Sequence, residues 1–271
     1  MKKTTSVSYR NKLYLGVALL VVIILLVATY YLKATCLSLP GMGTCQRVLF
    51  IGNSYTYVND LPQVFTNLAR SGGYRVQTGM AAQGGWTLSD HVSSSASQAL
   101  LRSSKWDIVV LQEQSETPAI EQSRTTSMYP AARQLVGQIT GLGARPVFFI
   151  TWAHREGLPD YGLLDFQSMQ FSIDRAYLGI AGELNVPLAP VGYAWLIAYG
   201  QDPQLELWQQ DGSHPTQQGT YLAACVFYAA IFHQSPEGLN YLDQLAMDVA
   251  KELQTVAANT VLNDAVQWNI H

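Results

Sequence analysis

Charged residues are scarce in this sequence. Asp, Glu, Lys and Arg make up 13% of its 271 residues, against roughly 25% in typical soluble domains, and the net charge is -3. No cluster of basic residues is present, and nucleic-acid binding depends on such a cluster. Low-complexity tracts and internal repeats are missing as well. We therefore expect no nucleic-acid partner, and the length allows one large domain or two small ones.

One stretch lacks charge altogether, residues 13–32, LYLGVALLVVIILLVATYYL. Its twenty residues match the length that a helix needs to cross a bilayer. Basic residues are more numerous before it than just after it, with Lys2, Lys3, Arg10 and Lys12 on one side and Lys33 and Arg47 on the other. The positive-inside rule places residues 1–12 in the cytoplasm and the chain after residue 33 outside. We predict a single-pass membrane protein held by an uncleaved signal anchor.

Three other interpretations of this stretch are weaker. A buried core helix would have to be apolar on all sides at the very N-terminus. The apolar region of a cleaved signal peptide is usually about 7–15 residues long, and Lys33 and Thr35 flank Ala34, so no small-x-small cleavage site follows cleanly. The same two residues fit a lipoprotein signal before Cys36 poorly.

Cysteine is scarce too, with three in the chain. Cys36 and Cys45 bracket a short stretch with Gly and Pro inside the predicted juxtamembrane linker, residues 33–46. An oxidising compartment outside the cytoplasm would permit a disulfide between them. Cys225 lies in YLAACVFYAA, and we expect it to be a buried apolar residue.

The remaining chain, residues 47–271, is predicted to form one domain in which strands and helices alternate. Apolar runs predict strands at 47–52, 106–112, 145–152 and 186–190, and YRVQTGMAA at 74–82 is a plausible further strand. Helical patterns occupy 61–71, 87–103, roughly 124–141, roughly 168–184, roughly 217–233 and 239–262. Strands that are apolar on both sides belong to a parallel sheet with both faces covered. We predict a three-layer α/β/α domain with a parallel, flavodoxin-like sheet of about five strands.

Polar or glycine-rich segments follow several of these strands. Ser54 comes just after the first strand, in FIGNSYTYVNDLP, and QGGWTL follows the second. The third ends in LQEQSETP, and DGSHPTQQG follows the fifth. Ligands of an open parallel sheet bind beyond the carboxyl ends of its strands. The four segments are therefore expected to meet at one edge and to form the functional site.

Three of these residues suit nucleophilic catalysis. The hydroxyl of Ser54 is a weak nucleophile and needs an adjacent base, which His214 can supply. Asp211, three residues before His214, can accept from the other ring nitrogen and so fix the tautomer. Gly212 permits the turn that this spacing needs, and Thr216 can cap the apolar helix that follows.

The four segments resemble the sequence blocks of the SGNH (GDSL-type) hydrolase superfamily. IGNSYT is similar to its first block, with Asn53 where Asp is commonest, and QGGWTL resembles the second, with Gly85 as the block's glycine. WDIVVLQEQS resembles the third block and DGSHPTQQGTYLAA the last. The resemblance extends from about residue 47 to about residue 233. It implies an oxyanion hole that includes the backbone N–H groups of Ser54 and Gly85.

The third block departs from the family pattern. Its usual Gly-x-Asn is replaced by QEQS, so no Asn stands at the oxyanion-hole position. Gln114 or Gln112 is expected to supply the amide instead, as in a branch of the superfamily that carries Gln. The two residues lie on the same side of the strand, and Gln114 is favoured because it lies further beyond the strand end. Glu113 is expected to lie on the other side of the strand or to be structural.

The resemblance implies a serine esterase that acts through an acyl-enzyme and uses no metal or organic cofactor. The α/β-hydrolase fold is a poorer match because GNSYT lacks the second Gly of G-x-S-x-G. A metal hydrolase is poorer still, since the sequence has no H-E-x-x-H motif. A membrane-anchored binding protein on an inactive scaffold stays open as a different class.

The substrate is less determined than the chemistry. The family covers lipid esters, short acyl esters and O-acetyl groups on sugars. The sequence has no second long apolar segment for a lid, and aromatic residues lie near the proposed site. We therefore expect a small-molecule or glycan ester, with O-acetylated carbohydrate outside the cytoplasm as the favoured substrate and a lipid or short-chain ester as the alternative. The oligomeric state is not predicted.

Overall fold

The computed structural model describes residues 44–270 together with 14–15, 17, 19–22 and 36. The predicted cytoplasmic segment 1–12 lies outside these residues, as does most of the predicted anchor at 13–32. In the described part of the chain, no helix combines the length and the apolar character needed to span a bilayer.

Five parallel strands form the sheet, in the order β2-β1-β3-β4-β5. They are β1 (Cys45–Gly52), β2 (Arg75–Ala82), β3 (Ile108–Leu111), β4 (Arg145–Phe149) and β5 (Leu188–Ala189). This is the flavodoxin-like order, in which the chain reverses its direction of travel along the sheet between β1 and β3. The predicted parallel α/β domain is confirmed, and each strand lies within its predicted run or extends it by at most two residues.

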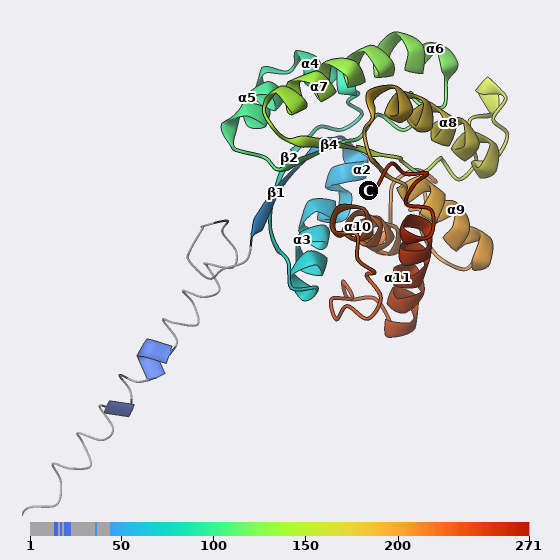
Figure 1. Ribbon diagram of the computed structural model, residues 1–271. Helices are drawn as coiled ribbons and strands as arrows, with labels where there is room; N and C mark the ends of the chain where they lie inside the picture. The colour runs from blue at the N-terminus through green and yellow to red at the C-terminus, as the bar shows by residue number, and fades with distance from the viewer. Residues whose placement is uncertain (1–13, 16, 18, 23–35, 37–43, 271) are drawn as a thin grey trace, which may run out of the picture.

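Helices cover both faces of the sheet (Figure 1). One face carries α3 (Leu61–Ser71), α10 (Gln217–Phe232) and α11 (Met247–Leu262), with α9 (Val191–Gln201) packed against α10 and α11. The other carries α4 (Leu88–Ser93), α5 (Ser95–Ser103), α7 (Tyr129–Gly141) and α8 (Phe166–Leu184). All four residues of β3 are buried as a result, which explains its unbroken apolar sequence.

The two edge strands differ in how they are protected. β2 is only partly buried along its length. β5 has two residues, and its outer edge is covered by the C-terminal segment, where the N–H of Leu188 donates to the carbonyl of Trp268 at 2.9 Å. This cap leaves little unpaired backbone at that edge, as stable sheets require.

The helices depart from the predicted bounds at four places. The predicted helix at 87–103 is two helices, because Ser94 is extended and its side chain caps α5. In 124–141, a π-helical turn (Arg124–Met128) precedes α7, where Pro130 has no N–H to continue the ladder. The last helix begins at Met247 rather than 239, since Asp243 and Gln244 have positive φ angles. α9 was not predicted.

Helix α10 is the centre of its layer. Thirteen of its 16 residues are buried, and it contacts α3, α9 and α11. A helix that is apolar on all sides belongs inside a domain, which accounts for the apolar run predicted at 217–233. Cys225 lies on it, free and fully buried, as predicted, and burial raises the pKa of its thiol. Because α10 starts directly after the His214 segment, it anchors that segment in the core.

Candidate active site

Strand β1 carries Ser54 to the carboxyl edge of the sheet. The strand ends at Gly52, and Ser54 is the first residue of the short helix α2 (Ser54–Tyr57). Asn53 caps this helix, because its side-chain oxygen accepts from the N–H of Tyr55 at 3.1 Å. Asn53 is buried while Ser54 is partly exposed, so the turn presents the serine hydroxyl toward solvent.

The segment 207–216 is a closed turn with Asp211 and His214 near its tip. The N–H of Gln209 donates to the carbonyl of His214 at 2.8 Å, and the N–H of Gly212 donates to the carbonyl of Gln209 at 3.0 Å. Gly212 has a φ of 69°, in the left-handed region that favours glycine. At the end of the turn, Thr216 caps α10 by accepting from the N–H of Gly219, as predicted.

The turn places the two side chains in line with Ser54. Nε2 of His214 lies 3.0 Å from Oγ of Ser54, and Nδ1 lies 2.6 Å from Oδ2 of Asp211. The other oxygen of Asp211 accepts from the backbone N–H groups of Ser213 and His214, at 2.9 Å each. A carboxylate only accepts, so Nδ1 carries the proton, and the lone pair of Nε2 faces the serine hydroxyl.

Asp211 is held in its ionised form. Burial alone would raise its pKa, but the hydrogen bonds from Ser213 and His214 outweigh that effect and hold the pKa below its usual value. The side chains of Asp211 and His214 are 47% and 36% exposed, so the pair is open to water. The arrangement is therefore a poised base next to a hydroxyl, at the edge where the fold places its ligands.

Gln112 is fully occupied in holding Asn53. Its Oε1 accepts from the N–H of Asn53 at 2.7 Å and from the hydroxyl of Thr56 at 2.9 Å. Its amide nitrogen donates to Oδ1 of Asn53 at 2.9 Å and to the carbonyl of Glu113. Both amide hydrogens are used and the residue is fully buried, so Gln112, the second candidate for the oxyanion hole, has no donor to offer.

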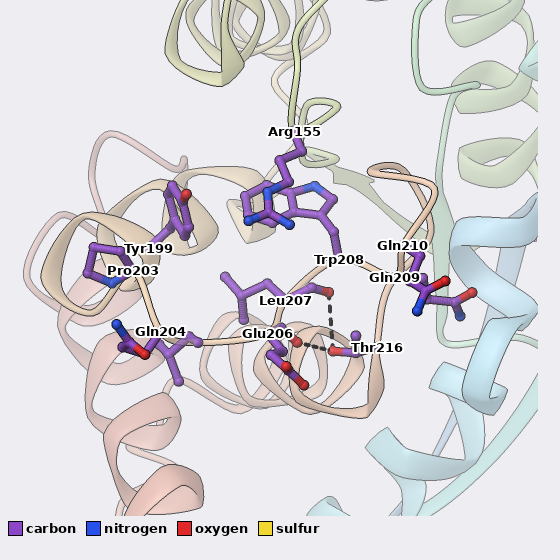
Figure 2. Close-up of a pocket in the computed structure, with 11 residues that line it drawn as sticks. Arg155, Tyr199, Pro203, Gln204, Glu206, Leu207, Trp208, Gln209, Gln210 and Thr216 are labelled. Atoms are coloured by element: carbon purple, nitrogen blue, oxygen red, sulfur yellow. Dashed lines mark hydrogen bonds between the residues drawn. The ribbon is translucent and has the colours of Figure 1, made fainter.

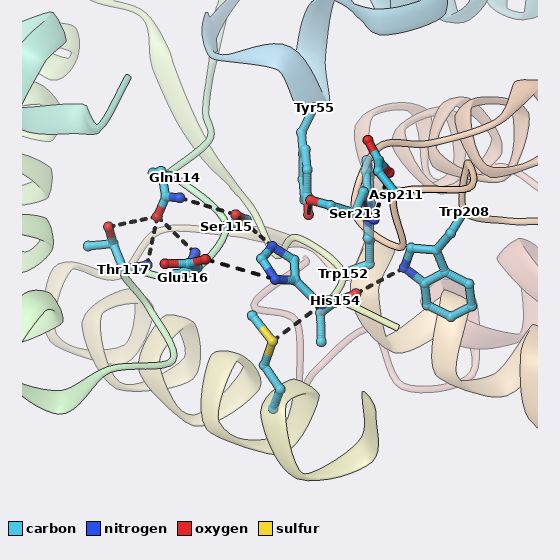
Figure 3. Close-up of polar contacts among 12 residues, drawn as sticks. Tyr55, Gln114, Ser115, Glu116, Thr117, Trp152, His154, Trp208, Asp211 and Ser213 are labelled. Atoms are coloured by element: carbon cyan, nitrogen blue, oxygen red, sulfur yellow. Dashed lines mark hydrogen bonds and ion pairs between the residues drawn. The ribbon is translucent and has the colours of Figure 1, made fainter. Parts of the chain in front are cut away.

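Gln114 differs from Gln112 in that most of its hydrogen bonds are made by its side-chain oxygen. Oε1 accepts from the N–H groups of Glu116 and Thr117, at 2.8 and 3.0 Å, and from the Thr117 hydroxyl at 3.1 Å. The amide nitrogen donates to Oγ of Ser115 at 3.2 Å (Figure 3). Within the described residues, no hydrogen bond uses its second amide hydrogen, so Gln114 retains a donor whose position is fixed by the contacts of its carbonyl.

Gly85 lies in an exposed turn after β2. The N–H of Trp86 donates to the carbonyl of Gln83 at 3.1 Å, and Gly85 has a φ of 74° at the third turn position. That conformation requires glycine in a type II turn. In the described part of the chain, no hydrogen bond uses the N–H of Gly85, which leaves it available as a donor. The amide of Asn53 donates to the carbonyl of Trp86 at 3.0 Å and so ties this turn to the Ser54 segment.

A polar network beside the three residues was not foreseen from the sequence (Figure 3). The hydroxyl of Tyr55 shares a hydrogen bond with Oγ of Ser213 at 2.8 Å. Nε2 of His154 lies 3.1 Å from Oγ of Ser115, and burial lowers the pKa of this histidine. The signal in the sequence is that His154 follows β4, at the same edge of the sheet as Ser54.

The aromatic residues near the site divide into two groups. Tyr55 and Trp152 are core residues, and their rings stack with centroids 4.3 Å apart. Trp152 stacks in turn on Trp195 at 4.1 Å. Trp86 is half-buried and Tyr57 is 41% exposed, so these two lie at the surface near the Gly85 turn.

A groove of about 450 Å³ adjoins the segment that carries Asp211 (Figure 2). Its lining is mostly polar. It includes two aromatic rings, of Tyr199 and Trp208, and the polar or charged side chains of Arg155, Gln204, Glu206, Gln209 and Gln210. The volume is in the usual range of small-molecule sites. Across the residues that the structure describes, no three His, Cys, Asp or Glu side chains converge as metal ligands would.

The fold is shared with known structures. The chain is similar to a protein from Slackia heliotrinireducens, itself a candidate SGNH hydrolase, at 28% identity and a TM-score of 0.60, over 69% of this chain and 100% of that one. The chain belongs to the SGNH hydrolase superfamily. No protein-family model and no curated protein matches it.

Two further structures share the fold of this SGNH member. A DUF4886 family protein from Bacteroides uniformis is 22% identical with a TM-score of 0.67, over 80% of this chain and 95% of that one. An acetylxylan esterase from Geobacillus stearothermophilus, solved as a catalytic mutant, is 15% identical with a TM-score of 0.52, over 69% and 94%. At these identities the likeness concerns the fold.

Proposed function

We propose that the protein is a serine esterase that hydrolyses acyl esters through an acyl-enzyme. The observation that carries this proposal is the hydrogen-bonded chain from Ser54 through His214 to Asp211. It lies at the carboxyl edge of the sheet, in a member of a hydrolase superfamily. The pKa of Asp211 is held below its usual value, which favours the ionised carboxylate that this role needs, and Nε2 of His214 faces the hydroxyl of Ser54.

The reaction follows from this geometry. Oγ of Ser54 attacks the ester carbonyl carbon while Nε2 of His214 takes the hydroxyl proton, and Asp211 stabilises the imidazolium that forms. The imidazolium then returns the proton to the departing alkoxide, which leaves as the alcohol. In the second half, His214 activates a water molecule that attacks the acyl-enzyme, and the acid is released with Ser54 restored.

Charge develops on the carbonyl oxygen during both attacks. We assign its stabilisation to the backbone N–H groups of Ser54 and Gly85 and to the free amide hydrogen of Gln114. Removing one oxyanion-hole donor typically lowers turnover by roughly 10²–10³-fold. Gln114 then replaces the usual Asn with a side chain that is one methylene longer and donates through the same kind of amide group.

O-acetylated carbohydrate is the proposed substrate. Acetylxylan esterases are among the solved structures with this fold, and the groove beside Asp211 offers amides, one guanidinium and one carboxylate to a polyhydroxyl ligand. Arg155 and Glu206 leave that lining without a large net charge, which suits a neutral sugar. A lipid or short-chain ester, or binding without turnover, are the competing outcomes of the tests below.

We also propose that the domain lies outside the cytoplasm, anchored by residues 13–32. Support comes from the disulfide between Cys36 and Cys45, whose Cα atoms are 5.3 Å apart. Disulfides persist in oxidising compartments and are rare in the cytosol.

A serine-directed fluorophosphonate tests the nucleophile. We expect it to label Ser54, as located by peptide mass spectrometry, and to abolish turnover of p-nitrophenyl acetate. Ser54→Ala should remove both the label and the activity, while Ser71→Ala, at an exposed serine at the end of α3, should change neither. A label on another serine, or full activity in Ser54→Ala, would refute the assignment.

A panel of esters tests the substrate class. Acetylated xylo-oligosaccharides should be turned over with a higher kcat/KM than p-nitrophenyl octanoate. Gln210→Ala should raise KM for the acetylated sugar and leave the KM for p-nitrophenyl acetate unchanged, because only the sugar reaches the groove. A preference for the octanoyl ester would favour a lipid substrate, and no turnover of any ester would favour the inactive binding protein.

A further inference from the structure

Glu113 is a buried carboxylic acid in the middle of the third block. Its side chain is fully buried. One oxygen, Oε1, accepts from the backbone N–H of Gln114 at 2.7 Å and from that of Leu88 at 3.1 Å. The other oxygen, Oε2, has no hydrogen-bond partner among the described residues. Leu88 comes three residues after Gly85, so a single oxygen joins two segments that carry proposed oxyanion donors.

Glu113 completes a set of three links. The Ser54 segment is tied to the Gly85 turn by the amide of Asn53, which donates to Trp86. It is tied to the third block by Gln112, which accepts from the N–H of Asn53. Glu113 closes the remaining side between the second and third blocks. Each pair of donor-bearing segments is therefore held together by one buried polar side chain.

We propose that Glu113 is a positioning residue of the oxyanion hole, and that its Oε1 sets the spacing between the Gly85 turn and Gln114. The proposal rests on the proposed esterase function. Glu113 touches no substrate in this scheme. It acts through the two backbone N–H groups that it holds, so its effect belongs to the transition state, where the spacing of donors matters most.

The energetics argue against a purely structural role. Burying a carboxyl group with one oxygen unpartnered is unfavourable, and an apolar residue at this position would avoid that cost. Burial raises the pKa of Glu113 to about 7, although the hydrogen bonds from Gln114 and Leu88 act in the opposite direction; the nearby charge of Asp90 raises it further. The side chain of Asp90 on α4 and the hydroxyl of Tyr177 on α8 are the titratable groups that interact with it.

Three variants of Glu113 separate positioning from packing. Glu113→Ala loses both contacts, and we expect kcat for p-nitrophenyl acetate to fall by about 10–100-fold with KM within about 3-fold of wild type. Glu113→Asp keeps the acid but shortens the reach, and we expect a similar loss. Glu113→Gln keeps an oxygen that accepts both N–H groups, so it should retain kcat within about 5-fold.

Gln254→Ala is the matched control. Gln254 on α11 is equally buried and also holds a loop, because its Oε1 accepts from the N–H of Gly238 at 3.0 Å. This variant should lower the free energy of unfolding and leave kcat unchanged. Stability is measured for all four variants by urea denaturation, so a loss of rate can be compared with the loss of stability.

The outcomes distinguish this proposal from the function on which it rests. A wild-type protein that neither hydrolyses aryl esters nor labels at Ser54 defeats the esterase function itself. An active wild type with wild-type kcat in Glu113→Asp, or with equal losses of kcat in Glu113→Asp and Glu113→Gln, overturns the positioning role alone. Glu113→Asp serves for this decision if Glu113→Ala does not fold.

Discussion

At the scale of single residues, Asn53 explains its own departure from the family pattern. Its amide nitrogen donates to the carbonyl of Trp86, and its oxygen accepts from Tyr55 and from the amide of Gln112. An ionised Asp can only accept. It would set a carboxylate oxygen against the Trp86 carbonyl, so Asn is the residue that satisfies both neighbours here.

Asn53→Asp is therefore expected to destabilise the domain. The variant loses a donor at a buried position, which typically costs about 1–3 kcal/mol. Urea denaturation measures the change in the free energy of unfolding. Asn240→Asp, at an exposed loop position, is the control and should change stability by less than about 0.5 kcal/mol. Equal effects of the two substitutions would show that the Trp86 contact contributes nothing.

The buried acids set the pH dependence of stability. The pKa of Glu113 is raised by burial to about 7 from the usual 4.5, and that of Asp174 to about 7 from 3.8. The folded state thus holds these protons more tightly than the unfolded state. Their contribution is fully present below the unfolded pKa values and is lost as the pH rises to about 7. Burial lowers the pKa of His91, so its contribution to stability has the opposite pH dependence. The folded state loses that contribution as the pH falls through about 6.5.

Glu113→Gln tests this dependence, because an amide has no proton to release. The free energy of unfolding is measured at pH 5 and pH 8 in the wild type and the variant. We expect the loss between pH 5 and pH 8 to be smaller in the variant by roughly 1–3 kcal/mol. An unchanged difference would mean that Glu113 ionises in the folded protein much as it does in the unfolded chain.

At the scale of elements, the segment 207–216 depends on one glycine and one helix. Gly212 closes the turn in a left-handed conformation, and α10 holds the far end through the cap at Thr216. Gly219 on α10 lies against the ring of Trp195 and the carbonyl of Leu207, so no larger residue fits there. The turn is thus fixed between the core and the sheet edge.

Gly212→Ala should disturb this element without a clash. The nearest atom to an added Cβ is 3.5 Å away, so the cost comes from the φ of 69°, about 1–2 kcal/mol. We expect a loss of stability of that size and a fall in kcat of about 10-fold, because Asp211 and His214 shift together. Gly137→Ala, in the middle of α7 with open space around it, should instead be neutral or stabilising. Denaturation and ester turnover of both variants decide the point.

At the scale of the whole molecule, strand β1 separates Cys45 from Ser54, because it runs across the sheet between them (Figure 1). β1 begins at Cys45, which is bonded to Cys36, and it ends two residues before Ser54. Eight strand residues span roughly 25 Å. Under the proposed anchor at 13–32, the chain would enter the domain at Cys45, at the end of β1 opposite to Ser54, and this placement suits a water-borne or cell-surface glycan ester better than a bilayer lipid.

The topology has a direct test. A reporter that is active only outside the cytoplasm, fused after His271, should be active, and the same reporter fused before Met1 should be silent. N-terminal sequencing should find residues 1–12 still attached. A mature protein that starts near Cys36 would show a processed signal or a lipoprotein, and an inactive C-terminal reporter would place the domain in the cytoplasm.

Local sequence determined a large part of this picture. Unbroken apolar runs give buried parallel strands because both faces of the sheet are covered, and polar residues after those runs must then gather at one edge. Ser54, Asp211 and His214 were found in this way, since each stands just beyond a strand or just before an apolar helix. Their approach within hydrogen-bond distance is a feature of the structure, and their catalytic roles stay a prediction.

The rest was decided only by tertiary packing. The sequence places Gln112 and Gln114 two residues apart on one side of a strand, and nothing local separates them. The structure does, because the amide hydrogens of Gln112 are taken by the side-chain oxygen of Asn53 and the carbonyl of Glu113. Helix α9 is apolar on most sides and shows no period, so only its packing against α10 and α11 identifies it. The role proposed for Glu113 depends on Leu88, 25 residues away, which no local pattern could bring to its carboxylate.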